Sequence, residues 1–284
     1  MKHIRIVCLT LVLAILLGNS CNKADAKEIN IAVASDIHLS KTESNGKRDL
    51  SNSYKALTGF VKRTKENDYN FVMFTGDVID KSTPINAQYF FETIKGIDTP
   101  YYIVIGNHDA HKIAGMTKKE YLEIISANNP HQKKAKSSYY FYPTNDVIAI
   151  VIDGASSGMP CSHGIFNPDT LKWLDELLTK NKDKKAIIFQ HFPLVEPYVA
   201  PSHDILNKNE YKAIINKHDN ILIITSGHYH KEAYQKDENG VAHLSAPALY
   251  EAPYYYVHIK ISYDKHPFSK AKNFKIWAEE KPAI

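Results

Sequence analysis

The chain has 284 residues, of which 44% are hydrophobic and 23% are charged, proportions typical of a globular protein with a sizeable core. Its formal net charge is +4, which falls to +2 when Lys2 and Arg5 of the N-terminal leader are left out. So small a charge, without a long basic run, argues against a protein that binds nucleic acid electrostatically, and we expect no nucleic-acid partner.

Residues 1–20 predict an export signal. Lys2 and Arg5 precede an apolar run over residues 6–17, which has the length of a signal-peptide core and is short for a membrane span. We therefore expect the chain to be exported, as a periplasmic or cell-envelope protein or as a secreted one.

Two cleavage sites for this leader stay open. Residues 18–21 (Gly-Asn-Ser-Cys) resemble a lipoprotein signal, which would make Cys21 the lipidated first residue and anchor the protein to a membrane. Residues 24–26 (Ala-Asp-Ala) fit ordinary signal peptidase, which would end the signal at residue 26. We favour the lipoprotein. With either site, Cys161 has no partner for an intramolecular disulfide.

Strands and helices alternate along the chain that follows. Apolar spacing predicts, in order, strand 29–35, helix 50–66, strand 70–75, helix 85–97, strand 101–105 and helix 118–127. The second half is predicted to contain a hairpin over 138–152, helix 168–180, strand 186–190, helix 209–217, strand 221–225, a hairpin over 232–244 and late strands at 254–262 and 273–278. Asn167 and Pro168 are typical of a helix start, and Asn239-Gly240 of a hairpin turn.

This alternation predicts an α/β fold. The strand-rich later part indicates a second sheet packed on the first, so we expect two packed mixed β-sheets flanked by helices, a four-layer α/β/β/α sandwich. No linker or repeat divides the chain, which predicts one domain over residues 27–284.

A polar motif follows each of the five buried strands. Strand ends at the carboxyl edge of an α/β sheet are where ligands bind, because the loops there converge. Alternate residues of an extended segment face one side, and glycine allows a sharp turn after a strand. The motifs are Asp36-Ile37-His38, Gly76-Asp77, Gly106-Asn107-His108-Asp109, His191-Phe192-Pro193 and Gly227-His228-Tyr229-His230.

Together these motifs supply two aspartates, an asparagine and four histidines that divalent cations accept as ligands. An isolated histidine is more often a hydrogen-bonded core or surface residue. Five polar clusters at five strand ends are hard to explain in that way. The set is large enough for two adjacent cations that share one carboxylate.

In this order, the motifs resemble the pattern D-x-H, G-D, G-N-H-D/E, H and G-H-x-H of the calcineurin-like metallophosphoesterase superfamily, over residues 31 to about 250. The branch with cyclic-nucleotide and glycerophosphodiester phosphodiesterases is the most similar. The resemblance implies that one metal is held by Asp36, His38 and His230, that a second is held by Asn107, His191 and His228, and that Asp77 bridges them. It also implies that His108 faces the substrate and that Asp109 orients the His108 ring.

The function implied is that of an exported binuclear phosphoesterase. It would hydrolyse small phosphomonoesters or phosphodiesters by attack of a metal-bridging hydroxide, with Mn, Fe, Zn or Co as the two divalent ions. The alternative is a non-catalytic metal-binding or interaction module on the same fold. The pair His108 and Asp109 favours the enzyme, since a binding module has no need of it. Substrate identity and oligomeric state stay open.

Three further residues are weaker candidates. Tyr198 and His203 lie in a proline-rich loop after His191, and we expect them to contact substrate if that loop covers the site. Asp80 stands where purple acid phosphatases have a tyrosine ligand. We expect Asp80 to cap a helix or face solvent rather than to support a metal ligand.

Overall fold

The computed structural model describes residues 25–41, 48–111, 113, 115–158, 161–266 and 269–284. The predicted export signal over residues 1–20 and Cys21 lie outside these residues, whereas residues 25 and 26 of the alternative signal are described. No helix in the described ranges is long and apolar enough to cross a membrane.

One sheet has five strands in the order β11-β10-β1-β2-β3. Strands β1, β2 and β3 run parallel, and β10 and β11 extend the sheet as an antiparallel hairpin beside β1. Their bounds are β1 (Asp25–Ala34), β2 (Phe71–Phe74), β3 (Tyr101–Ile103), β10 (Tyr255–Lys265) and β11 (Lys272–Pro282).

The other sheet has six strands in the order β4-β5-β6-β7-β9-β8. Strands β5, β6, β7 and β9 are parallel, whereas β4 and β8 pair antiparallel at the two edges. The strands are β4 (Tyr139–Thr144), β5 (Val147–Val151), β6 (Lys185–Phe189), β7 (Ile221–Ser226), β8 (Ala233–Lys236) and β9 (Ala242–Ser245).

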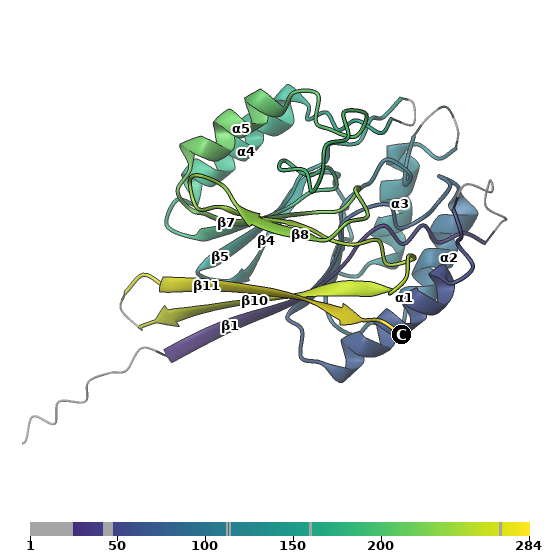
Figure 1. Ribbon diagram of the computed structural model, residues 1–284, viewed down its shortest axis with the longest axis horizontal. Helices are drawn as coiled ribbons and strands as arrows, with labels where there is room; N and C mark the ends of the chain where they lie inside the picture. The colour runs from purple at the N-terminus through teal and green to yellow at the C-terminus, as the bar shows by residue number, and fades with distance from the viewer. Residues whose placement is uncertain (1–24, 42–47, 112, 114, 159–160, 267–268) are drawn as a thin grey trace, which may run out of the picture.

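The two sheets pack face to face, and helices cover their outer faces (Figure 1). Alternate side chains of both sheets, such as Ile31 and Val33 of β1 and Ala149 and Val151 of β5, form the core between them. Helices α1 (Ser53–Glu66), α2 (Pro84–Ile94) and α3 (Lys118–Asn128) cover the first sheet, and α4 (Pro168–Lys180) and α5 (Lys208–Lys217) cover the second. The predicted four-layer α/β/β/α sandwich is confirmed.

Most predicted elements are present with ends shifted by a few residues. Helix α4 begins as its sequence predicts, with the Asn167 side chain accepting a hydrogen bond from the backbone N–H of Asp169. The late strands β10 and β11 are longer than predicted. Strand β11 is an edge strand with charged side chains on an exposed face, so its apolar pattern is weak although its backbone pairs with β10.

Candidate metal centre

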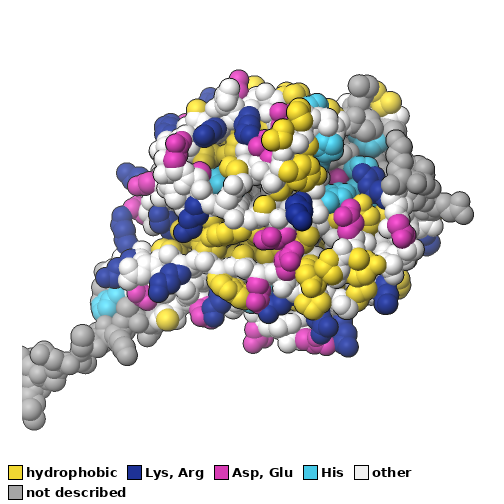
Figure 2. All heavy atoms as spheres, in the orientation of Figure 1, with side chains coloured by type: hydrophobic (Ala, Val, Ile, Leu, Met, Phe, Trp, Pro, Cys, Tyr) yellow, Lys and Arg dark blue, Asp and Glu magenta, His cyan; other side chains and the backbone are white. Residues whose placement is uncertain are grey.

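The predicted ligands lie immediately after strands of both sheets. Asp36, Asp77 and Asn107 follow β1, β2 and β3 of one sheet, while His191 and His228 follow β6 and β7 of the other. The site therefore lies where the carboxyl ends of both sheets meet. Histidine side chains gather on this part of the surface in Figure 2.

The backbone is strained at these ligand positions. Among the described residues other than glycine, seven have positive φ, and five of them are predicted ligands, with φ from 47° to 71°: Asp36, His38, Asp77, His228 and His230. Such conformations cost free energy and persist where the surroundings enforce them, often at functional sites. The sequence-based expectation of an extended D-x-H segment is wrong, because Asp36 and His38 are both left-handed.

One ligand group joins β1 to the loop after β7. The Nε2 atoms of His38 and His230 lie 3.3 Å apart, and Oδ1 of Asp36 lies 3.4 Å from Nε2 of His230. The other carboxylate oxygen of Asp36 accepts hydrogen bonds from the Ser35 hydroxyl and the backbone N–H of His228. Oδ1 of Asp36 is buried and has no hydrogen-bond partner among the described residues. It is therefore free to bind a cation.

A second group lies beside the first. Oδ1 of Asn107 is 3.1 Å from Nε2 of His191, and the His191 and His228 ring centroids are 4.9 Å apart. Both rings also donate to backbone carbonyls. His191 donates from Nδ1 to Thr75, and His228 donates from Nε2 to Ser162. These hydrogen bonds fix the ring orientations, as is usual for histidines that bind metals.

Asp77 stands between the two groups. Its Oδ2 lies 3.7 Å from Nε2 of His38 and 3.4 Å from Nε2 of His191. Asp77 accordingly belongs both to a potential metal-binding set with His38 and His108 and to one with His191 and His228. This is the position that a shared carboxylate would need.

Charge in the site also suits divalent cations. Burial would raise the pKa of Asp36, but the neighbouring His230 ring lowers it to about 2. Burial would lower the pKa of His230 and His191, but the carboxylates of Asp36 and Asp77 raise them to about 10 and about 9. The buried carboxylates thus stabilise the protonated form of the neighbouring histidines. A bound cation would provide the same compensating positive charge.

Two other rings of the site are neutral. Burial lowers the pKa of His38 to about 4 and that of His228 to about 3. A neutral imidazole is the form that binds a metal. The donor types, the unpartnered carboxylate oxygen and these neutral rings together fit two divalent cations.

His108 and Asp109 are adjacent in the chain but do not pair. The Asp109 carboxylate accepts hydrogen bonds from the backbone N–H groups of Gly106, Asp77 and Ile79. The His108 ring instead donates from Nδ1 to the carbonyl oxygen of Asp80, 2.8 Å away. The prediction that Asp109 orients His108 is therefore wrong, because the buried carboxylate is taken up by backbone donors of the loops that carry the ligands.

Asp80 has a different place from the one expected. It is 5% exposed, and its Oδ1 lies 3.6 Å from Nδ1 of His38 and 3.3 Å from a guanidinium nitrogen of Arg48. The prediction of a helix cap or a solvent-facing side chain is wrong. Asp80 is instead buried beside His38, with its carboxylate within ion-pair distance of that ring.

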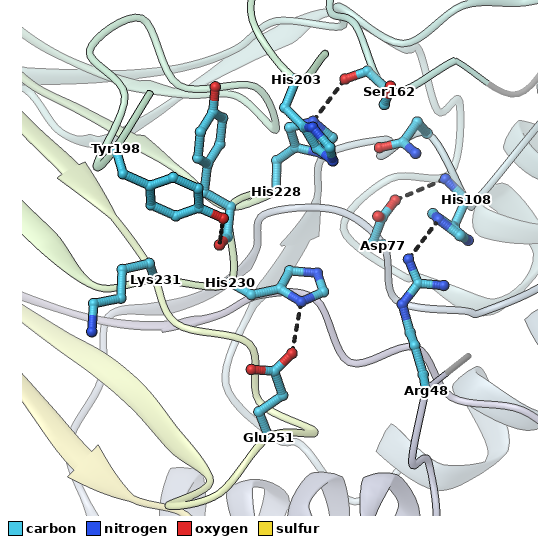
Figure 3. A pocket seen from close by; sticks show the side chains of 12 residues that line it. Arg48, Asp77, His108, Ser162, Tyr198, His203, His228, His230, Lys231 and Glu251 are labelled. Atoms are coloured by element: carbon cyan, nitrogen blue, oxygen red, sulfur yellow. Dashed lines mark hydrogen bonds and ion pairs between the residues drawn. The ribbon is translucent and has the colours of Figure 1, made fainter. Parts of the chain in front are cut away.

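A cavity of about 460 Å³ opens onto the two ligand groups. Tyr198 and His203, the predicted substrate contacts, both line it (Figure 3). Tyr198 is 52% exposed, and its hydroxyl donates to the backbone carbonyl of Tyr229. The structure thus brings the proline-rich loop to the mouth of the cavity.

Arg48 and Glu251 are among the cavity residues that the sequence did not predict. Arg48 points toward His108 and Asp77 in Figure 3, with a guanidinium nitrogen 3.2 Å from Nε2 of His108. Glu251 lies 2.9 Å from Nδ1 of His230. Arg48 is one of only two arginines after the leader, which could have drawn attention to it. Nothing in the sequence around Glu251 signals its contact with His230.

Residues 29–232 match the sequence model of the calcineurin-like phosphoesterase family, and the chain belongs to this family. It is thus a metal-dependent hydrolase of phosphoester bonds. A dimetal phosphatase from Danio rerio has the same fold, with a TM-score of 0.65 and 15% identity over 88% of this chain and 98% of that one.

Curated relatives agree with the branch expected from the motifs. A probable glycerophosphodiester phosphodiesterase from Arcobacter nitrofigilis is 27% identical over 175 residues, which is 57% of this chain and only 57% of that protein. A 3′,5′-cyclic-nucleotide phosphodiesterase from Nostoc sp. is 25% identical over 78% of both chains. A 3′,5′-cyclic adenosine monophosphate phosphodiesterase from Haemophilus influenzae is 26% identical over 80% of this chain and 78% of that one.

Proposed function

We propose that the chain hydrolyses small phosphodiesters outside the cytoplasm, with two divalent cations as cofactors. The observation that carries this proposal is the position of Asp77, whose Oδ2 lies within 3.7 Å of His38 and 3.4 Å of His191. Among the relatives, several bear the names of phosphodiesterases. The apolar leader with its cleavage motifs supports export.

Seven side chains would hold the cations. Asp36, His38 and His230 form the first group, Asn107, His191 and His228 form the second, and Asp77 serves both. When bound, the cations would polarise the phosphoryl oxygens and lower the pKa of a water molecule, so that it gives up a proton and supplies hydroxide as the nucleophile at neutral pH. Mn²⁺, Fe²⁺, Zn²⁺ and Co²⁺ all accept this set of ligands.

The remaining polar groups of the cavity would bind and orient the ester. The Arg48 guanidinium has five N–H donors and contacts only Asp80 and His108 among the described residues, so it has donors left for a phosphoryl oxygen. Because the Asp80 carbonyl can only accept, Nδ1 of His108 carries a proton, and Nε2 is left beside Arg48 in the cavity. Protonated at Nε2, His108 would donate to the leaving oxygen as the ester bond breaks.

The shape of the cavity favours a small substrate. A volume of about 460 Å³ suits a ligand of nucleotide or smaller size. Tyr198 at its mouth would contact the ester group that projects from the phosphate. A phosphodiester has two such ester groups on phosphorus, whereas a phosphomonoester has one. A diester could therefore place one group against Tyr198 while the other is the leaving group.

A panel of reconstituted metals tests the proposal. The chain is stripped of metal, loaded with Mn²⁺, Fe²⁺, Zn²⁺ or Co²⁺, and assayed on bis-p-nitrophenyl phosphate and p-nitrophenyl phosphate, with and without the substitution His108→Ala. We expect faster turnover of the diester and a loss of that turnover in the variant. Turnover of the monoester alone would contradict the diesterase assignment. No turnover of either ester with any metal would favour the metal-binding module.

A further inference from the structure

A cluster of lysines lies at the end of the molecule away from the metal centre. Two adjoining surface hollows lie there. Their lining residues come from the end of α4, the start of β6, the end of β10 and the loop before β11. We call this cluster the lysine-rich end, and it consists of Lys180, Lys182, Lys184, Lys185, Lys265 and Lys270. Dark blue side chains gather on this side of Figure 2, where Figure 1 draws the start of β1.

Positive charge is concentrated at the lysine-rich end. Its hollows contain six lysines against two acidic residues, Asp146 and Asp183, a net charge of +4. Of the 35 lysines and arginines of the chain, three precede residue 25, whereas none of the 31 acidic residues does, so residues 25–284 carry a net charge of +1. The rest of the molecule is therefore net negative.

The two acidic residues do not neutralise the cluster. Lys265 pairs with Asp146 and Lys270 with Asp183. Lys180 and Lys182 form no ion pair with any described carboxylate, and both are exposed. Lysines without an ion-pair partner that cluster on one face make a surface that attracts a polyanion or an anionic membrane.

The path of the chain decides between these two partners. Strand β1 begins at Asp25, whose Cα pairs with that of Lys265, so the N-terminal segment leaves the sheet at the lysine-rich end. Cys21 lies only four residues earlier in the sequence. Four residues span at most about 14 Å. A lipid on Cys21 would thus hold the lysines close to the bilayer, where anionic head groups attract them over a Debye length of about 8 Å.

We propose that the lysine-rich end docks on the anionic head groups of a phospholipid bilayer. Strand β1 then leads away from the membrane for 10 residues, or about 33 Å, before the chain reaches Asp36. The metal centre would lie at the far end and take its substrate from the aqueous phase. This inference does not depend on the diesterase activity, since docking and turnover are measured separately.

Hydrogen exchange of the full chain tests the proposal. The chain is bound to vesicles of phosphatidylcholine, with and without phosphatidylglycerol, and backbone amide exchange is followed by mass spectrometry. We expect amides of residues 182–185 and 269–272 to exchange several-fold more slowly only when phosphatidylglycerol is present. Raising NaCl to about 1 M, where the Debye length is about 3 Å, should abolish this difference. Equal exchange on both kinds of vesicle would overturn the proposal.

Matched charge reversals locate the surface. The variant Lys182→Glu, Lys184→Glu, Lys270→Glu should lose the difference between the two vesicles and keep its phosphoesterase activity, because these residues are far from the metal centre. The control Lys55→Glu, Lys95→Glu, Lys119→Glu makes the same charge change on α1, at the end of α2 and on α3, and should keep the difference. The proposal is wrong if only the control loses it.

A soluble polyanion distinguishes the other partner. Polyuridylate is offered to the same full chain at low salt, without vesicles. Slower exchange at residues 182–185 and 269–272 with polyuridylate, together with no difference between the two vesicles, would assign the surface to nucleic acid and contradict membrane docking. Membrane docking is supported if anionic vesicles slow the exchange of these amides at least as much as polyuridylate does.

Discussion

The position of Asp77 makes it the residue on which both ligand groups depend. If it serves two cations, the substitution Asp77→Asn removes a negative charge from both. Loss of a general acid costs about 10²–10⁴-fold in rate. We therefore expect Asp77→Asn to lower kcat/KM on bis-p-nitrophenyl phosphate more than His108→Ala does. The opposite order would mean that Asp77 does not join the two groups.

Arg48 offers a prediction about substrate binding. A charge-assisted hydrogen bond is worth about 1.5–3 kcal/mol, so Arg48→Ala should raise KM about 10-fold or more. Its metal content should stay that of the wild type, because Arg48 contacts His108 and Asp80 rather than the predicted ligands. Arg63→Ala on α1 removes the same side chain from an exposed pair with Glu66 and is the control. An unchanged KM would exclude Arg48 from the binding site.

Glu251 is predicted to act through His230. Its carboxylate accepts from Nδ1 of the ring and leaves Nε2 directed at Asp36 and His38. Loss of such a partner commonly costs 10–100-fold in metal affinity. Glu251→Ala should show this loss in a calorimetric Mn²⁺ titration, while Glu238→Ala, in the exposed β8–β9 loop, should not. Equal affinities in the two variants would remove Glu251 from the site.

At the residue scale, the ligand types could be predicted, but their partners could not. Seven donors after strand ends are visible in the sequence, and the structure brings them together. The hydrogen-bond partners of the Asp109 carboxylate are the backbone N–H groups of Asp77, Ile79 and Gly106. Likewise, Glu251 reaches His230 only through the fold, 21 residues along the chain. Contacts of this kind carry no local sequence pattern.

Among the elements, the turn after β7 depends on the absence of a side chain at Gly227. A Cβ there would lie 1.9 Å from Oγ of Ser35 and 2.5 Å from Oδ2 of Asp36. Gly227→Ala should therefore displace Asp36, lower the free energy of unfolding by about 1–3 kcal/mol and weaken metal binding. Chemical denaturation and metal titration measure the two effects.

Gly158→Ala is the matched control, because no atom lies within 4 Å of a Cβ at that position. Wild-type stability and metal affinity in both variants would contradict a close approach of Gly227 to Asp36. The sequence predicted a glycine for a sharp turn here, whereas the structure requires it for close approach to Asp36. Of the three motif glycines Gly76, Gly106 and Gly227, Gly76 alone has a positive φ, +98°, as such a turn suggests.

Element positions were easier to predict than element ends. Buried strands such as β6 are continuous apolar runs, and α4 has both its cap and its apolar face in the sequence. Strand β11 has charged residues along much of its length, and backbone pairing with β10 rather than side-chain burial fixes its extent. Pairing partners are set by topology, which a local pattern does not contain.

The whole molecule explains why the site needs both sheets. Each ligand group takes members from the first sheet, through the loops after β1, β2 and β3, and from the second, through the loops after β6 and β7. The core between the sheets, with Ile31, Val33, Ala149 and Val151, fixes how these loops face each other. The metal centre is thus a property of the sheet packing rather than of any single motif.

The most direct test of this account is the number and place of bound metals. Crystals of the chain loaded with Mn²⁺ would be measured by anomalous diffraction at the manganese edge. We predict two peaks in each molecule, one among Asp36, His38 and His230 and one among Asn107, His191 and His228, both in contact with Asp77. A single peak, or peaks away from Asp77, would contradict it.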